Sequence, residues 1–274
     1  MQASIGWTQP TGALGRLTEA AHERVRVLLP DAQRLEAAAR LAARGPSFAN
    51  ALRDTQGVAV IAEIKRRSPS KGEIAASLSA ADQAQAYAAG GAAAISVLTE
   101  EREFGGTLAD LDAAAPARIP RLRKDFIVDR LQMLEAVIHG ASAVLLIVRA
   151  LPADRLAELM ADASALGLDA LVEVHTEREL HGILGLRPAI IGVNNRDLET
   201  LEVDDSASTR LIPMIPAASL AVYESGIRTR GDVERAASLG ADAVLVGTAL
   251  SSSGDATSAV RALVSVRRHR RHAA

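Results

Sequence analysis

Eight short apolar runs recur between Val58 and Gly247, and a segment with helical spacing follows each of them. Apolar runs of this length are typical of strands buried on both faces, and their alternation with helices is typical of a parallel sheet closed into a barrel. We therefore predict an α/β fold, a (β/α)8 TIM barrel with extra N-terminal helices. The third run is the weakest, because Arg121 and Arg123 interrupt it. The predicted strands are residues 58–64, 93–98, 120–123, 143–148, 170–174, 190–193, 220–224 and 243–247.

One or two further helices are predicted ahead of the barrel, over residues 14–29 and 31–43, because Pro30 divides the helical pattern. The length of 274 residues fits one barrel domain with little to spare. We expect a helical extension packed on the barrel, a barrel catalytic domain and a frayed basic C-terminal tail, over residues 1–44, 45–263 and 264–274 respectively.

The composition excludes several kinds of chemistry and of partner. The chain has no cysteine, which removes disulfides, thiolate nucleophiles and Cys-type zinc sites and fits a reducing compartment. Its formal net charge of −2 creates no field that would attract nucleic acid or an anionic membrane. No stretch approaches the roughly 18 apolar residues of a membrane span, and the first residues lack the pattern of a signal peptide. We expect a cytoplasmic protein with no nucleic-acid or membrane partner.

Polar side chains gather where the predicted strands end, and in barrels of this kind such side chains project to the face that carries the chemistry. Burying unpaired charge costs several kcal/mol, so a purely structural barrel has no reason to collect ionisable groups there. We predict an active site at this end, with ion pairs that merely close the barrel as the alternative. The side chains are Glu63, Lys65, Thr99, Glu100, Lys124, Asp125, Arg149, Glu173, His175, Asn194, Arg196, Glu224, Ser225 and Thr248.

Several segments together resemble the indole-3-glycerol-phosphate synthase family. The longest is Ile-Ala-Glu-Ile-Lys-Arg-Arg-Ser-Pro-Ser-Lys-Gly at residues 61–72, and Leu-Arg-Lys-Asp-Phe-Ile-Val follows at residues 122–128. The resemblance extends from about Gly45 to about Leu250, whereas the N-terminal helices fit only loosely. The other segments that match in order are residues 96–100, 104–106, 171–175, 192–198, 224–227 and 244–247.

Three positions depart from the pattern of that family. Arg121 stands where an aliphatic residue is usual, Tyr223 replaces a small residue, and Thr248 replaces a small or acidic one. If Glu224 points into the barrel, strand alternation turns Tyr223 outward toward the helices, where it does not block the pocket. Arg121 has no obvious place.

The resemblance implies a carbon–carbon lyase of tryptophan biosynthesis, a decarboxylase that converts 1-(2-carboxyphenylamino)-1-deoxyribulose 5-phosphate to indole-3-glycerol phosphate, CO2 and water. As the ring carbon attacks the ketone, negative charge develops on the ketone oxygen, and Lys124 is the expected acid. We expect desolvation and the neighbouring cation Lys65 to lower the pKa of Lys124 toward neutrality.

The same resemblance assigns the remaining catalytic roles. Lys65 is expected to grip the departing carboxylate and to take part in the dehydration. Glu63 and Asn194 are expected to hold cations and hydroxyls in place. Glu173 is the expected base that removes a proton when water leaves.

The substrate-binding residues are expected at the phosphate and at the ring. Small residues after the last two strands expose backbone N–H groups to a phosphate, with further contacts from Ser68, Lys65 and Arg196. Phe104 and Phe126 are expected to wall an apolar slot for the anthranilate ring. The full expected set is Ser68, Phe104, Phe126, Arg196, Glu224, Ser225, Gly226, Leu245, Gly247 and Thr248.

No metal or organic cofactor is expected. His175 follows Glu173 by two positions, but no third ligand has suitable spacing, and we interpret His175 as structural. The reaction that the resemblance implies needs no cofactor, and the sequence carries no dinucleotide fingerprint.

Two other functions stay open. A phosphoribosylanthranilate isomerase-like enzyme is the nearest rival, although it lacks the Lys-Asp-Phe segment after the third strand. A non-catalytic barrel that binds a phosphorylated ligand or a protein is the other, although Lys65, Lys124 and Glu173 are all present. In each case the expected partner is a small phosphorylated molecule, with the chain a monomer or a weak homo-oligomer.

Overall fold

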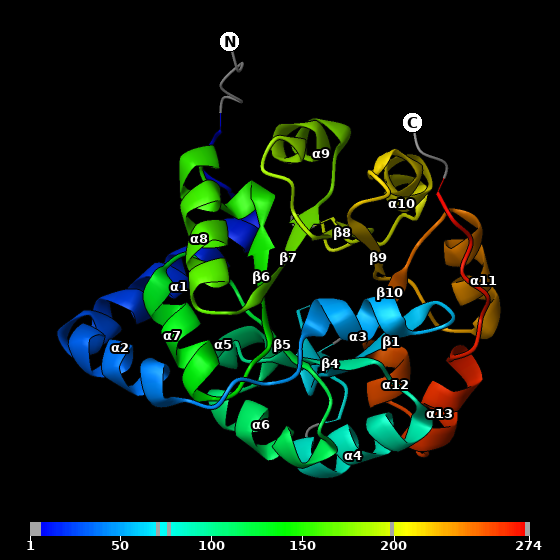
Figure 1. The fold of residues 1–274 in the computed structure, drawn as a ribbon, viewed down its shortest axis with the longest axis horizontal. Helices are drawn as coiled ribbons and strands as arrows, with labels where there is room; N and C mark the ends of the chain where they lie inside the picture. The colour runs from blue at the N-terminus through cyan, green and yellow to red at the C-terminus, as the bar shows by residue number, and fades with distance from the viewer. Residues whose placement is uncertain (1–6, 70–71, 76–77, 198–199, 272–274) are drawn as a thin grey trace.

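The computed structural model describes residues 7–69, 72–75, 78–197 and 200–271. Within this part of the chain, eight parallel strands close into a barrel (Figure 1), which confirms the predicted fold class. Every predicted strand is present with its ends displaced by no more than one residue. In order around the barrel the strands are β1 (Ala59–Ile64), β4 (Ala94–Leu98), β5 (Arg121–Lys124), β6 (Ala143–Ile147), β7 (Asp169–Val174), β8 (Ile190–Asn194), β9 (Leu220–Glu224) and β10 (Ala243–Val246).

Helices surround the barrel, and their apolar residues face it at helical spacing. In α8 (Ala153–Ala165), for example, Leu156, Leu159 and Ala163 are buried. The helix α4 (Ala80–Gly90) ends where Gly91 adopts a left-handed backbone, φ 96°, which lets the chain turn into β4. The other helices that follow strands are α5 (Glu101–Phe104), α6 (Leu108–Ala113), α7 (Arg130–Ile138), α9 (Glu177–Leu184), α10 (Ser206–Leu211), α11 (Arg230–Ser238), α12 (Thr248–Ser251) and α13 (Ala256–Leu263).

The short segments complete the described chain. Single 3-10 turns follow several of the strands and helices, and a small two-stranded antiparallel sheet follows β1. These segments are η1 (Leu29–Asp31), η2 (Ala115–Ala117), η3 (Val148–Ala150), η4 (Ile212–Met214), β2 (Arg67–Ser68) and β3 (Gly72–Glu73).

The N-terminal extension contains the two expected helices, α1 (Gly12–Leu28) and α2 (Ala32–Leu41), with Pro30 in the 3-10 turn between them. Arg130 of α7 joins α2 to the barrel helices, because its guanidinium pairs with Glu36 at 2.9 Å and with Asp162 at 2.8 Å. A third helix, α3 (Phe48–Asp54), was not predicted. It lies at the amino end of the barrel (Figure 1), where its backbone is held by Asp169, the first residue of β7.

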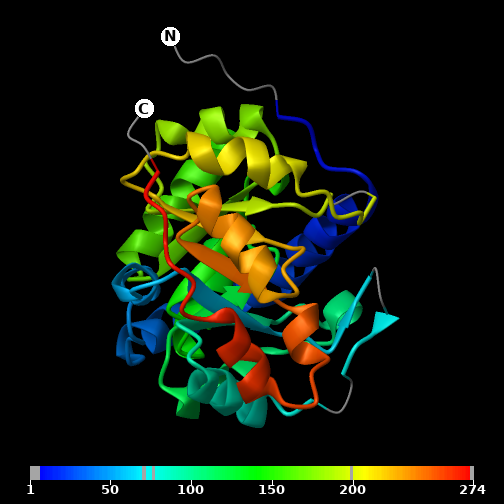
Figure 2. The same ribbon diagram turned by 90° about the vertical axis from the view of Figure 1, so that its right-hand side faces the viewer.

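The C-terminal tail up to residue 271 is held against the barrel, which differs from the frayed end that we expected. Arg268 and Arg271 both approach Asp242, at 3.6 and 2.7 Å, and Arg268 also donates to the carbonyl of Leu52. Figure 2 shows this segment in red, running along the side of the barrel. The arginines that suggested a solvated tail therefore neutralise a carboxylate at the start of β10; residues 272–274 lie outside the described chain.

The two unusual strand residues point away from the barrel interior. Tyr223 is buried against the outer helices, as strand alternation predicted, while Glu224 faces inward. Arg121 donates to the carbonyl of Leu111 at the end of α6, and Arg123 donates to Gln132 of α7. Because the guanidinium groups of Arg121 and Arg123 have hydrogen-bond partners outside the barrel, these arginines interrupt the apolar run without interrupting the strand.

In the described chain no helix is both long and apolar enough to cross a membrane.

Candidate active site

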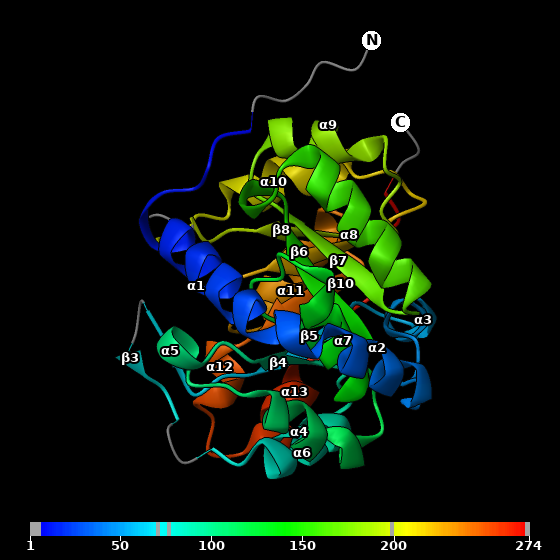
Figure 3. The same ribbon diagram turned by 90° about the vertical axis from the view of Figure 1, so that its left-hand side faces the viewer.

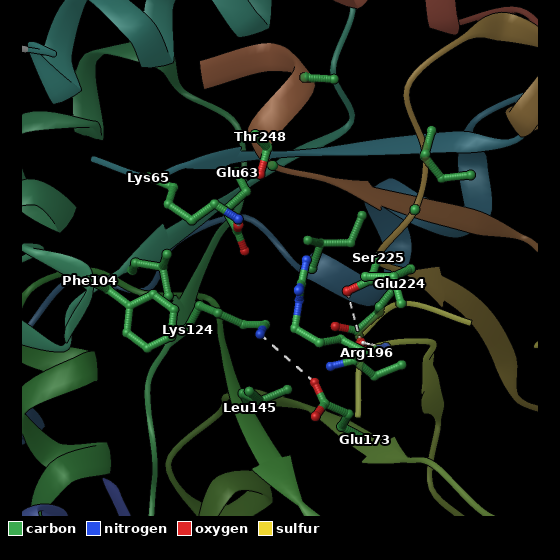
Figure 4. A pocket seen from close by; sticks show the side chains of 18 of the residues that line it. Glu63, Lys65, Phe104, Lys124, Leu145, Glu173, Arg196, Glu224, Ser225 and Thr248 are labelled. Atoms are coloured by element: carbon green, nitrogen blue, oxygen red, sulfur yellow. Dashed lines mark hydrogen bonds and ion pairs between the residues drawn. The ribbon is translucent and has the colours of Figure 1, made fainter. Parts of the chain in front are cut away.

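A cavity of about 380 Å³ opens at the carboxyl ends of the strands (Figure 4). It brings together all but one of the residues that the sequence analysis assigned to catalysis or to substrate binding. Ser68 is the exception, and it lines a smaller cavity of about 70 Å³ that shares Lys65, Phe104 and Arg196 with the main one. The catalytic and substrate-binding residues that line the main cavity are Glu63, Lys65, Phe104, Lys124, Phe126, Glu173, Asn194, Arg196, Glu224, Ser225, Gly226, Leu245, Gly247 and Thr248. Of the other strand-end side chains, Asp125 also lines it, whereas Thr99, Glu100, Arg149 and His175 do not.

Glu63 and Lys65 form a close ion pair at the end of β1, with 2.8 Å between Oε1 and Nζ. Burial alone would raise the pKa of Glu63, but Lys65 and then Lys124 outweigh it and hold the pKa below its usual value. Gly247 packs against this pair: a Cβ at that position would overlap Glu63 Oε1 and come within 2.8 Å of Lys65 Nζ. The carboxylate of Glu63 is therefore ionised, and it holds the ammonium group of Lys65 in place.

Lys124 lies among carboxylates, with its Nζ 3.8 Å from Glu173 Oε2 (Figure 4). Burial by itself lowers the pKa of Lys124, but the charges of Glu173, Glu224 and Glu63 outweigh it and raise the pKa above its usual value. The expectation that Lys65 would depress this pKa is therefore wrong. The three acidic neighbours, on the alternate strands β7, β9 and β1, outweigh burial and the nearby cation, and Lys124 enters the reaction as an ammonium ion.

Glu173 and Glu224 are each 1% exposed, and they face the same space. Glu173 Oε2 lies 3.8 Å from Lys124 Nζ, and its Oε1 lies 3.5 Å from His175 Nε2. Burial and the charge of Glu173 raise the pKa of Glu224 well above its usual value. The cavity thus combines Glu63, whose pKa is held low, with Glu224, whose pKa is raised well above its usual value, and such a separation of pKa values lets acid and base groups coexist in one site.

The end of β8 is organised around the side-chain oxygen of Asn194. This oxygen accepts hydrogen bonds from Ser225 Oγ at 2.8 Å and from the backbone N–H of Arg196 at 3.0 Å. The remaining hydrogen-bonding capacity of Asn194 is its NH2 group, a donor. The guanidinium of Arg196 in turn donates to the carbonyl of Leu201.

Small residues form the end of the cavity that lies across from Phe104 (Figure 4). Ser225 and Gly226 both adopt positive φ, 66° and 95°, so their backbone turns sharply after β9. Gly247 precedes α12, and Ala249 and Ser252 beyond it also line the cavity. The sequence analysis missed Arg228, which lines this end as well. Its position two residues after the glycine, in the same strand-end loop, is the signal that could have identified it.

An aromatic and aliphatic wall bounds the remaining side. The rings of Phe104 and Phe126 have centroids 6.4 Å apart and are tilted by 38°. Leu98, Leu145 and Ile147 complete this wall. The sequence analysis did not single out these aliphatic residues, because nothing in an apolar strand distinguishes the inward residue nearest the mouth from those below it.

His175 is not part of the cavity lining. Its Nε2 lies 3.5 Å from Glu173 and its Nδ1 lies 3.7 Å from Glu179 of α9, so it joins the back of Glu173 to a helix. Among the described residues no group of three histidine, aspartate or glutamate side chains is arranged to hold a metal ion.

Comparison with known proteins gives a consistent result. A family model described as "Indole-3-glycerol phosphate synthase" matches residues 14–263. Relatives with that same name include one from Rhodococcus jostii (strain RHA1), 52% identical over 78% of this chain and 80% of its own. Another, from Mycobacteroides abscessus, is 46% identical over 87% of this chain and 88% of its own.

Solved structures show the same fold at low sequence identity. A thiamine phosphate pyrophosphorylase from Pyrococcus furiosus matches with a TM-score of 0.55 and 15% identity, and the match covers 79% of this chain and 96% of that one. At such low identity the likeness concerns the barrel alone.

Proposed function

This chain belongs to the indole-3-glycerol phosphate synthase family, and from that membership we propose how its cavity residues divide the work of the reaction. The chain is a carboxy-lyase of tryptophan biosynthesis that acts on a phosphorylated small molecule. The substrate, 1-(2-carboxyphenylamino)-1-deoxyribulose 5-phosphate, loses CO2 and water as the indole ring forms. Three events need catalysis: attack of the ring carbon on the ketone, loss of CO2 and loss of water.

Lys124 is the general acid of ring closure. When the ring carbon bonds to the ketone carbon, the ketone π electrons move to oxygen, and the Lys124 ammonium donates a proton to that oxygen. The observation that carries this assignment is the position of Lys124 Nζ among Glu173, Glu224 and Glu63, which keeps it protonated. After attack, the electron pair of the ring–carboxylate bond returns to the ring as CO2 leaves.

Lys65 and Glu173 serve the steps that follow. Lys65, held by Glu63, binds the carboxylate before it departs. In the dehydration Glu173 removes a proton while an ammonium group protonates the departing hydroxyl. The carboxylate of Glu173 faces the cavity beside the Lys124 ammonium, where it is suited to accept that proton. Asn194, through its NH2 group, and Glu224 form hydrogen bonds with the hydroxyls of the substrate chain.

The two ends of the substrate take opposite ends of the cavity. The backbone around Ser225, Gly226, Gly247 and Thr248 receives the phosphate, with Arg228 and Arg196 as cations and Ser68 at the rim. The ring lies against the wall made by Phe104, Phe126 and Leu245 and their aliphatic neighbours.

We also retain three proposals about organisation. The chain divides into an N-terminal extension, residues 1–44, and a catalytic barrel domain, residues 45–263; residues 1–6, 70–71, 76–77 and 198–199 of these ranges lie outside the described chain. The protein works in the cytoplasm as a monomer or a weak homo-oligomer. It has no nucleic-acid or membrane partner, since its substrate is a small anion recognised inside the barrel.

One assay separates this function from its rivals. The purified protein is given the carboxyphenylamino-deoxyribulose phosphate, and indole fluorescence and released CO2 are measured together. The proposal expects both in equal amounts. Tight binding of the substrate without turnover would instead favour a non-catalytic barrel. In a parallel incubation with phosphoribosylanthranilate, its conversion to the carboxyphenylamino-deoxyribulose phosphate without release of CO2 would favour the isomerase.

A further inference from the structure

Arg24 of α1 lies outside the cavity and reaches two buried carboxylates on different strand-end segments. Its Nη2 donates to Asp125 Oδ1 at 2.7 Å, and its Nη1 lies 3.8 Å from Glu100 Oε1. The side chains of Asp125 and Glu100 are each 1% exposed, whereas that of Arg24 is 33% exposed. Figure 3 shows α1 passing beside α5, the helix that Glu100 precedes.

Glu100 holds the backbone that carries Phe104. It is the N-cap of α5, and its carboxylate accepts the backbone N–H groups of Arg102, Glu103 and Phe104 at 3.1, 2.7 and 3.2 Å. Since α5 is only four residues long, this cap fixes most of its free N–H groups. The position of the Phe104 ring therefore depends on where Glu100 lies.

Asp125 holds the backbone that carries Phe126. Its Oδ1 accepts the N–H of Phe126 at 2.8 Å, and its Oδ2 accepts Thr99 Oγ1 at 2.8 Å and Arg123 Nη2 at 3.0 Å. Burial alone would raise the pKa of Asp125, but Arg123 and Arg24 outweigh it and keep the pKa low. Asp125 is thus a fixed, ionised anchor directly after Lys124.

From these contacts we infer that Arg24 is a positioning residue that sets the separation between Phe104 and Phe126, and hence the affinity of the protein for the aromatic end of its substrate. One guanidinium connects the two carboxylates, and each carboxylate holds one of the two phenylalanines whose ring centroids are 6.4 Å apart. Leu14 and Leu17 of the same helix line the small cavity next to both rings, so α1 braces and covers one wall. This inference rests on the aromatic slot proposed above.

The test separates binding of the ring from binding of the phosphate. The affinities of wild type and Arg24→Met for anthranilate and for inorganic phosphate are measured by calorimetric titration. Methionine keeps the apolar stem and removes the charge-assisted hydrogen bond, so we expect anthranilate to bind about tenfold more weakly while phosphate affinity stays the same. The single ammonium of Arg24→Lys cannot bridge both carboxylates, so its affinity for anthranilate should lie between those of wild type and Arg24→Met.

Steady-state kinetics provide the second readout. In Arg24→Met we expect KM to rise about tenfold with kcat changed by less than about twofold. The control is Arg26→Met on the same helix, where the arginine pairs with the exposed Glu19 and both affinities should match wild type.

Three outcomes would overturn the inference. Unchanged anthranilate affinity in Arg24→Met would show that Arg24 does not act on the slot. An equal loss of both ligands would assign it a general structural role. Failure of the wild-type protein to bind anthranilate, with phosphate still bound, would remove the aromatic slot itself along with the part assigned to Arg24.

Discussion

The carboxyl group of Glu224 occupies the space that a side chain at Gly192 would need, because a Cβ built on Gly192 overlaps Glu224 Oε1. Residue 192 lies in β8 next to β9, so the glycine is required by the neighbouring strand and not by its own backbone, whose φ is not positive. We expect Gly192→Ala to displace Glu224, to lower kcat/KM at least about tenfold and to reduce the free energy of unfolding by about 1–3 kcal/mol.

The double variant Gly192→Ala/Glu224→Ala is the matched control for that prediction. Removing the carboxyl group makes room for the new methyl, so the double variant should be more stable to denaturant than Gly192→Ala alone. If Gly192→Ala keeps both the stability and the kcat/KM of wild type, the carboxyl group is not confined as the structure has it.

The titration of Glu224 should appear in the pH dependence of stability. Its pKa in the folded protein is raised well above the ordinary value of 4.5. The folded protein therefore retains a proton that the unfolded chain releases near pH 4.5, and this stabilisation is lost as the pH rises toward the folded pKa. Glu224→Gln is neutral at every pH and has no such loss.

Urea denaturation of both proteins between about pH 5 and about pH 8 measures this difference. We expect the free energy of unfolding of Glu224→Gln, relative to wild type, to increase steadily with pH. Glu63 and Asp125 have lowered pKa values, so the stability that they contribute is lost only below this pH range and does not shape the difference. If the free energies of unfolding of wild type and Glu224→Gln change with pH in parallel, the raised pKa of Glu224 is contradicted.

Arg228 should contribute to binding of the phosphate and not to chemistry. It lines the cavity in the loop after β9, two residues beyond Gly226. We expect Arg228→Ala to raise KM about tenfold at unchanged kcat, and to weaken inhibition by inorganic phosphate by the same factor. Arg230→Ala, which removes an exposed pair with Glu234, is the control and should leave both constants unchanged. A fall in kcat without a change in KM would rule out this role.

The tail should stabilise the barrel without taking part in catalysis. The side chain of Arg271 is 5% exposed and pairs with Asp242 at 2.7 Å at the start of β10. Arg271→Met leaves Asp242 with only the more distant Arg268, at 3.6 Å, and removes the hydrogen bonds of Arg271 to the carbonyls of Ile215 and Ser219. We expect it to cost about 1–3 kcal/mol of stability, measured by denaturant unfolding, at unchanged kcat. The exposed neighbour Arg270 provides the control variant Arg270→Met. If Arg271→Met and Arg270→Met are equally stable, the tail is only loosely attached to the barrel.

The sequence was sufficient for the barrel because each strand is a compact apolar run, and for the nominated side chains because a barrel projects its strand-end residues to one face. It did not predict α3, whose seven residues carry too little periodicity to stand out. Nor did it predict that Arg268 and Arg271 of the tail pair with Asp242, since these contacts join segments that are far apart in the sequence.

The pKa of Lys124 was mispredicted for a related reason. Sequence places Lys65 and Lys124 at the same end of the barrel, but only the structure shows how many carboxylates approach the Lys124 ammonium and at what distance. The sign of a pKa shift is set by the sum of burial and all neighbouring charges, and here the acidic neighbours prevail.

The central claim, that Lys124 is the proton donor of ring closure, is tested most directly by single-turnover indole fluorescence of wild type and Lys124→Ala, with substrate affinity measured alongside. The account predicts that the variant binds the substrate within about tenfold of wild type and forms indole about a thousandfold more slowly. Turnover by Lys124→Ala at a rate near that of wild type would contradict the claim and would transfer the acid role to another group in the cavity.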